Sequence, residues 1–261
     1  MVRAGTFNVR YITTEEDEQN NWENRKERVV RSIRENDCDI LGLQECSPLI
    51  QTYLTGQLGS TYDIRYFSPF VSSGAGSGGQ AIGLAYKKDR FTLDDWHFFW
   101  LSETPSVMVA NDGTHKRGGC CATLTAKSTG KRLFVMVTHG CLDADARAQW
   151  ASLYQEMEAL YNPGGYPSFF VGDMNAQPSD PASVTYRAYW NDVYLSDALK
   201  SGPYCTFNGF HLDRNLYTYK SRLDYVYYRN ATPLRYVCND RLYDGYYPSD
   251  HLPVYALMRL D

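Results

Sequence analysis

The chain has 261 residues, of which 43% are hydrophobic and 21% are charged, a balance typical of a globular protein with a sizeable core. Its net charge of −4 at pH 7 excludes an overall positive field that would attract nucleic acid or an anionic membrane. A local basic patch or a bound cation could still serve a nucleic-acid substrate. No apolar run is long enough to span a bilayer, so we expect no stable membrane insertion.

The N-terminal part is predicted to form a strand, a helix and a second strand. Residues 2–11 alternate as a strand does, with Asn8 near the end. Residues 40–43 form a continuous apolar run of the kind seen in fully buried strands. This run leads to Glu45, which either finds a partner or reaches solvent, because burying an unpaired carboxylate is costly. Between the strands a helix opens at Trp22, and we assign three cations to its solvated face: Arg25, Lys26 and Arg28.

The middle of the chain adds a helix, a loop and several strands. Residues 49–58 are predicted to be helical, and the Gly/Ser run at residues 72–79 is predicted to be a flexible loop. The short turn Thr129-Gly130 indicates that the strands on either side of it pair in antiparallel fashion. The predicted strands of this region are 81–86, one within 91–101, 119–126 and 132–138.

The C-terminal half continues the alternation. A helix is predicted over residues 143–160 and an apolar strand over 168–171. A strand over 223–228 and a last strand after residue 251 complete the pattern. Buried strands interleaved with helices indicate an α/β layered fold. Because no repeat or break in composition divides the chain, we expect a single domain over residues 1–261.

The cysteines bear on the cellular compartment. Seven is an odd number and no pair has zinc-finger spacing. We interpret them as mostly buried thiols, which favours a reducing compartment and hence the cytoplasm. If a signal peptide once preceded the strand that begins near Met1, the protein would instead be exported. We expect a monomer.

Polar side chains recur where predicted strands end. Since open sheets bind ligands at strand ends, we expect these groups to converge. They are Asn8, Glu45, His139, Asp173 with Asn175, and Asp250 with His251.

The residue types in this set restrict the chemistry. The carboxylates and the amide are hard oxygen ligands that suit Mg²⁺ or Mn²⁺ rather than zinc. The sequence has no G-x-S-x-G, no Walker phosphate loop and no G-x-G-x-x-G after a strand. A metal that polarises phosphoryl oxygens, a carboxylate that prepares water, and imidazolium or amide donors match the needs of phosphate-ester hydrolysis.

A series of short motifs resembles the endonuclease/exonuclease/phosphatase superfamily, which includes pancreatic deoxyribonuclease and abasic-site endonuclease. The motifs occur in the family's order and cover nearly the whole chain. They are Thr6-Phe7-Asn8-Val9-Arg10, residues 39–45 (DILGLQE), residues 100–105 (WLSETP), Val137-Thr138-His139, Gly172-Asp173-Met174-Asn175, residues 222–226 (RLDYV) and residues 249–254 (SDHLPV). The resemblance implies an α/β four-layer sandwich, with two mixed β-sheets face to face and helices outside.

The resemblance also implies a metal site and a water-activating group. Glu45 would hold the catalytic Mg²⁺, for which Mn²⁺ would substitute, with Asn8 beside it. Asp250 would join this metal or a second metal position. Asp173 would orient or deprotonate the attacking water, and Asn175 would steady the water or the phosphate.

Three further residues would bind the phosphate or support a residue that does. His251 would contact the phosphate and stabilise the transition state, and His139 would bind a phosphate oxygen. Asp224 would accept a hydrogen bond from His251 and fix its tautomer. We expect the strand that begins near Asp224 to lie next to the strand that follows His251.

Several positions depart from the family pattern or leave alternatives open. Abasic-site endonucleases carry an acidic residue where Arg10 stands, and the loop after His139 is altered. Arg117 either faces the substrate or is a solvated loop residue. Tyr247, with its tyrosine neighbours, either stacks a base or a sugar or packs into the protein.

The favoured function is a Mg²⁺-dependent hydrolase of phosphate esters, whether phosphodiesterase, nuclease or phosphatase. The substrate would be a small molecule or a short nucleic acid, since no basic stripe for a long duplex is present. One alternative is a lipid-headgroup phosphodiesterase or phosphatase, sphingomyelinase-like or directed at phosphoinositides, against which the lack of an apolar hairpin counts. Another is an inactive binding module, which would require the loss of a site residue.

Overall fold

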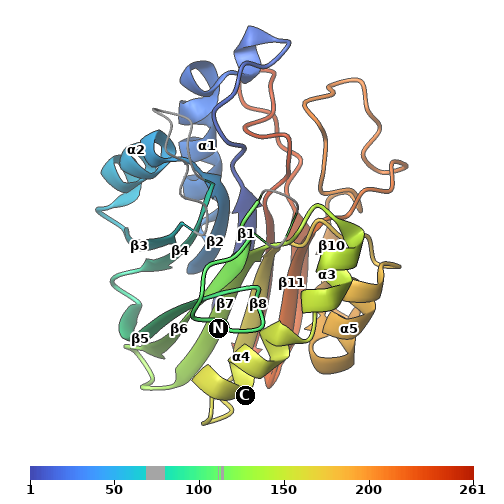
Figure 1. Ribbon diagram of the computed structural model, residues 1–261. Coiled ribbons are helices and arrows are strands. Elements are labelled where there is room, and N and C mark those ends of the chain that lie inside the picture. The colour runs from blue at the N-terminus through green and yellow to red at the C-terminus, as the bar shows by residue number, and fades with distance from the viewer. Residues whose placement is uncertain (69–79, 111, 113–114) are drawn as a thin grey trace.

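The computed structural model describes residues 1–68, 80–110, 112 and 115–261. The predicted loop at residues 72–79 lies outside these ranges. Within them, two β-sheets face each other and helices cover the outer faces (Figure 1). The expected α/β four-layer sandwich is therefore confirmed. None of the helices in the described ranges is long and apolar enough to cross a membrane.

The first sheet has seven strands in the described part of the chain. In spatial order they are β10 (Leu199–Ser201), β12 (Ala231–Cys238), β13 (Val254–Leu260), β1 (Val2–Asn8), β2 (Ile40–Cys46), β4 (Ala81–Lys87) and β3 (Tyr62–Phe67). The sheet is mixed, because β1 pairs with β2 in parallel and with β13 in antiparallel fashion.

The second sheet has six strands among the residues described. Their order is β5 (Phe91–Trp100), β6 (Gly118–Ala126), β7 (Arg132–His139), β8 (Ser168–Asp173), β11 (Asp224–Arg229) and β9 (Asn191–Asp192). The expected antiparallel pair is β6 and β7. β7 and β8 run parallel, so this sheet is also mixed.

Helices form the two outer layers. Side chains from α1 (Trp22–Asn36) and α2 (Pro48–Leu58) share an apolar cluster with the outer face of the first sheet. A second cluster joins the other sheet to α3 (Ala144–Trp150), α4 (Leu153–Tyr161) and α5 (Pro181–Tyr189). Two short 3₁₀ helices, η1 (Glu18–Asn20) and η2 (Val193–Leu195), lie in connections.

The apolar run of β2 is buried on both faces. Ile40 packs in the cluster between the two sheets, whereas Leu41 packs in the cluster beneath α1 and α2. This two-sided burial explains why the strand is continuously apolar rather than alternating. Gly42 follows on the inner face, where an added Cβ would lie 2.8 Å from a methyl carbon of Val171 in β8. The sheets can approach this closely only because residue 42 has no side chain.

Two expectations about helices were wrong. Arg25 and Arg28 of α1 are buried rather than solvated. Arg25 lies three residues after Trp22 and four before Val29, which places all three on the helix face that meets the protein. The helix expected over residues 143–160 is two helices, α3 and α4, separated at residues 151–152.

The polar strand ends meet at one rim of the sandwich. In register, Asn8 of β1 lies beside Gln44 of β2, and His139 of β7 lies beside Asp173 of β8. β11 runs antiparallel to β8, so Asp224 at its start is paired with Asp173.

The expected adjacency of β11 and β13 was wrong, because the two strands belong to different sheets. β11 pairs with β8 and β9, whereas β13 pairs with β1 and β12. The two strands contact each other across the sandwich instead.

Candidate active site

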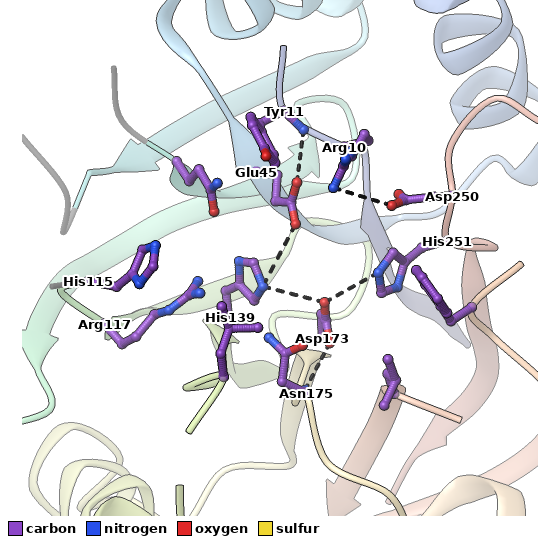
Figure 2. Close-up of a pocket in the computed structure, with 14 residues that line it drawn as sticks. Arg10, Tyr11, Glu45, His115, Arg117, His139, Asp173, Asn175, Asp250 and His251 are labelled. Atoms are coloured by element: carbon purple, nitrogen blue, oxygen red, sulfur yellow. Dashed lines mark hydrogen bonds and ion pairs between the residues drawn. The ribbon is translucent and has the colours of Figure 1, made fainter. Parts of the chain in front are cut away.

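A cavity of about 340 Å³ opens at this rim, and Figure 2 shows the side chains that line it. Asn8 and Asp224 are fully buried. They do not line the cavity but form hydrogen bonds with residues that do. Tyr247 does not reach the cavity, because it packs in the apolar cluster between the sheets. The lining includes seven residues singled out from the sequence: Glu45, Arg117, His139, Asp173, Asn175, Asp250 and His251.

Asp173 is the centre of the polar network. Its Oδ1 accepts a hydrogen bond of 2.9 Å from the backbone N–H of Asn175, and its Oδ2 accepts one of 3.0 Å from the Asn8 amide. The same oxygen lies 3.4 Å from Nε2 of His139 and 3.6 Å from Nε2 of His251 (Figure 2). Burial alone would raise the pKa of Asp173, but the two histidines outweigh burial and hold this pKa below its ordinary value. The carboxyl group is therefore ionised.

His251 lies between two carboxylates. Its Nδ1 is 2.8 Å from Oδ2 of Asp224, so the contact expected from the sequence is present although β11 and β13 are not neighbours. Burial acts to lower the pKa of His251, but the charges of Asp224 and Asp173 raise it well above its ordinary value. The imidazolium form is favoured, and its Nε2–H can donate into the cavity.

Glu45 is positioned by the end of β1. Its Oε1 accepts a hydrogen bond of 3.0 Å from the Asn8 amide, and its Oε2 accepts one of 2.9 Å from the backbone N–H of Tyr11. Burial opposes ionisation, but His139 and these two donors hold the pKa of Glu45 below its ordinary value. Glu45 therefore presents a charged carboxylate to the cavity.

The backbone is strained around this cavity. Arg10 (φ 58°), Glu45 (φ 62°) and Asn175 (φ 49°) all adopt left-handed conformations. For residues with a Cβ this conformation costs roughly 1–2 kcal/mol each. Such strain concentrates at functional sites, where the surrounding structure compensates for it.

The donor set suits a hard divalent cation. The carboxylates of Glu45 and Asp250 both line the cavity, and oxygen ligands of this kind suit Mg²⁺. Burial and the charge of Glu45 act to raise the pKa of Asp250, and a nearby cation would relieve both. Asp173, Asp224 and His251 also form a group close enough to hold a metal. Because His251 contacts Asp224 directly, this group is better suited to hold a proton on Nδ1 of His251 than to bind a metal.

Asn8, which was expected beside the metal, lies between the acids and is oriented by its own backbone segment. Its amide oxygen accepts a hydrogen bond of 3.0 Å from the backbone N–H of Arg10, which fixes the orientation of the amide. The NH₂ group therefore faces the acids and joins Glu45 of the first sheet to Asp173 of the second. Asn8 acts as a hydrogen-bond donor that aligns the two carboxylates.

Arg117 projects into the cavity opposite Asp250 (Figure 2). The side chain is buried, and its Nε lies 3.4 Å from Oδ2 of Asp112. Asp112 in turn accepts hydrogen bonds from the backbone N–H groups of Leu142 and Asp143. The altered loop after His139 is thus tied to Arg117 through Asp112.

Sequence reasoning missed part of the lining. Arg10 and Tyr11 directly follow the motif that contains Asn8, and His115 precedes Arg117 by two residues. Their closeness in sequence to Asn8 and to Arg117 is a signal that could have identified these three residues. The remaining lining residues carry no polar strand-end signal: Gln80, Leu142, Phe207 and Leu223.

The fold and the rim together define the class of protein. An α/β sandwich that gathers carboxylates and two histidines around one cavity is the arrangement of a phosphoester hydrolase. The chain belongs to the Endonuclease/Exonuclease/phosphatase family, whose model matches residues 5–251. Members of this family generally use a divalent metal ion.

Individual relatives are distant. Nocturnin of Mus musculus is 26% identical over 259 residues, which cover 88% of this chain but 57% of that protein. The chain therefore spans little more than half the length of this curated relative.

Solved structures resemble the chain over its whole length. A family member from Bacteroides vulgatus has a TM-score of 0.89 at 26% identity, with 100% of this chain and 99% of that chain covered. A mannosyl-6-phosphatase from Bacteroides thetaiotaomicron has a TM-score of 0.85 at 23% identity, with 99% of each chain covered. At this identity the second likeness shows the fold alone.

Proposed function

We propose that this protein is a Mg²⁺-dependent hydrolase of small phosphate esters, which works as a single-domain monomer over residues 1–261. The main observation in support is the position of Asp173, whose Oδ2 lies 3.4 Å from His139 and 3.6 Å from His251. This places a carboxylate and two imidazoles where an attacking water and a phosphate could meet. Mg²⁺ bound at Glu45 and Asp250, or Mn²⁺ in its place, would polarise the phosphoryl oxygens.

Each protein group has a distinct part in the proposed mechanism. Asp173 orients the attacking water, a role that its lowered pKa favours over strong proton abstraction. Asn175 steadies the water or the phosphate. His251 donates from Nε2 to a phosphate oxygen on which charge develops, and Asp224 holds the proton on Nδ1. His139 and Arg117 bind phosphate oxygens from the opposite side of the cavity.

The size and charge of the site favour a small substrate. A cavity of about 340 Å³ suits a compact phosphate ester, and the net charge of −4 disfavours a long duplex. A short nucleic acid is still within reach of such a site. The cysteine side chains are buried, and six of them are thiols in no disulfide, which supports a cytoplasmic location: Cys38, Cys46, Cys120, Cys121, Cys205 and Cys238.

The test is a panel of phosphate esters assayed with Mg²⁺, with Mn²⁺ and with EDTA. The panel would hold sugar phosphates, nucleoside monophosphates, a phosphodiester, a short oligonucleotide and vesicles that carry phosphoinositide. We expect turnover of small esters with Mg²⁺ or Mn²⁺ and none in EDTA. Full turnover in EDTA, or a requirement for zinc alone, would contradict the metal assignment. Preference for the vesicles would favour the lipid-headgroup alternative, and no turnover of any ester would favour a binding module.

A further inference from the structure

Arg10 is held in a strained conformation that directs its side chain into the cavity. Its backbone has φ 58°, and its guanidinium lines the cavity between Glu45 and Asp250 (Figure 2). Its NH1 lies 3.5 Å from Oδ2 of Asp250, and its Nε donates a hydrogen bond of 2.8 Å to Glu15. Two carboxylates therefore fix the guanidinium on the metal side of the site.

A second, fully buried arginine stabilises this conformation. The guanidinium of Arg25 in α1 donates to the backbone carbonyls of Val9 and Arg10. It also donates to the carbonyl of Tyr11 at 3.3 Å and to that of Pro248 at 3.4 Å. These bonds join the end of β1 to the segment that precedes Asp250. The buried guanidinium of Arg25 thus holds the strained backbone of Arg10 in place.

The two carboxylates on the metal side of the cavity differ in how closely an arginine approaches them. Glu45 and Asp250 are the two carboxylates proposed to hold the metal. Asp250 already faces a fixed positive charge, and any ion near it is repelled by Arg10 as well as attracted by the carboxylate. Glu45 has no arginine or lysine within ion-pair distance among the described residues.

We propose that Arg10 is a built-in cation that occupies the place of a second metal ion and limits the site to one divalent ion, bound mainly by Glu45. Arg10 pairs with Asp250 directly, so Asp250 orients the guanidinium and is left as a secondary ligand of the ion at Glu45. This inference rests on the proposed use of a divalent metal.

The test is to count bound Mn²⁺ by electron paramagnetic resonance and isothermal titration calorimetry, without substrate. We expect one ion per wild-type chain and one in Arg10→Lys, which keeps the charge. Arg10→Glu should bind two ions, because it removes the cation and adds a carboxylate. Arg31→Glu is the matched control, since Arg31 pairs with Asp244 at 2.7 Å on the exposed face of α1. This control should bind one ion.

Circular dichroism would establish that each variant is folded. If Arg10→Glu does not fold, Arg10→Gln removes the charge alone and should also admit a second ion. Two ions in the wild type would overturn the proposal, as would a single ion in a folded Arg10→Glu variant. In the latter case the metal dependence would stand while the role of Arg10 fails. A wild-type chain that binds no Mn²⁺ would overturn both.

Discussion

Replacing Asp224 with Asn tests the pairing of Asp224 with His251. The substitution keeps the shape of the side chain but removes the charge that lies 2.8 Å from Nδ1 of His251. A hydrogen bond to a charged group contributes about 1.5–3 kcal/mol, and each 1.36 kcal/mol changes a rate about tenfold. Because the imidazolium is needed when charge develops on the phosphate, we expect kcat to fall about 10- to 150-fold.

A double-mutant cycle separates this role from a general loss of structure. The kcat of Asp224→Asn, His251→Ala and the double variant would be measured on the best substrate from the phosphate-ester panel. If Asp224 acts only through His251, the double variant will be scarcely slower than His251→Ala. Losses that multiply would refute the reasoning. Asp192→Asn is the matched control, because it breaks a buried pair with Arg222 away from the cavity and should lower the melting temperature with little effect on kcat per folded molecule.

Three further predictions concern metal binding, water activation and positioning. Glu45→Gln should raise the Mg²⁺ concentration needed for half-maximal rate while the fold is retained, and an unchanged metal titration would remove Glu45 from the site. Asp173→Asn should lower kcat by on the order of 10²-fold or more, with a smaller effect on KM; near-normal kcat would contradict its role. Arg25→Lys should lower kcat by on the order of 10²-fold, because an ammonium cannot span the carbonyls that the planar guanidinium joins. Arg28→Lys is the control, because the guanidinium of Arg28 packs over the Tyr246 ring, and this variant should change kcat little. Equal losses of kcat in the two variants would argue against a positioning role for Arg25.

The buried central strands and the polar residues at their ends could be predicted from the sequence, whereas β3, β9, β10 and β12 were missed. Both faces of β2 and β7 are buried, so their apolar runs stand out, and a polar residue at the end of such a run is conspicuous. The same pattern contains no information on which sheet a strand joins. The pattern therefore cannot distinguish strands that are neighbours in one sheet from strands such as β11 and β13, which face each other across the core.

The error on α1 and the open alternatives at Tyr247 have a different cause. Arg25 has the charge of a surface residue, and its burial depends on carbonyl partners that other segments supply, up to Pro248. Its spacing from Trp22 and Val29 indicates the buried face, whereas its charge alone indicates a solvated position. Tyr247 stands beside the strand-end motif in sequence, yet its ring points into the core between the sheets. Proximity in sequence does not determine the direction of a side chain.

The two sheets make close contact at Gly42, and this contact lies near the carboxylates of the candidate active site. Glu45 lies three residues further along β2, whereas Asp173 lies two residues beyond Val171 in β8. We therefore expect the spacing of the sheets at Gly42 and Val171 to affect the separation of the two carboxylates, which one Asn8 amide joins. A methyl group at residue 42 would act as a spacer that alters this separation from inside the core, without touching the cavity. Gly42 thus couples interior packing to the alignment of the site.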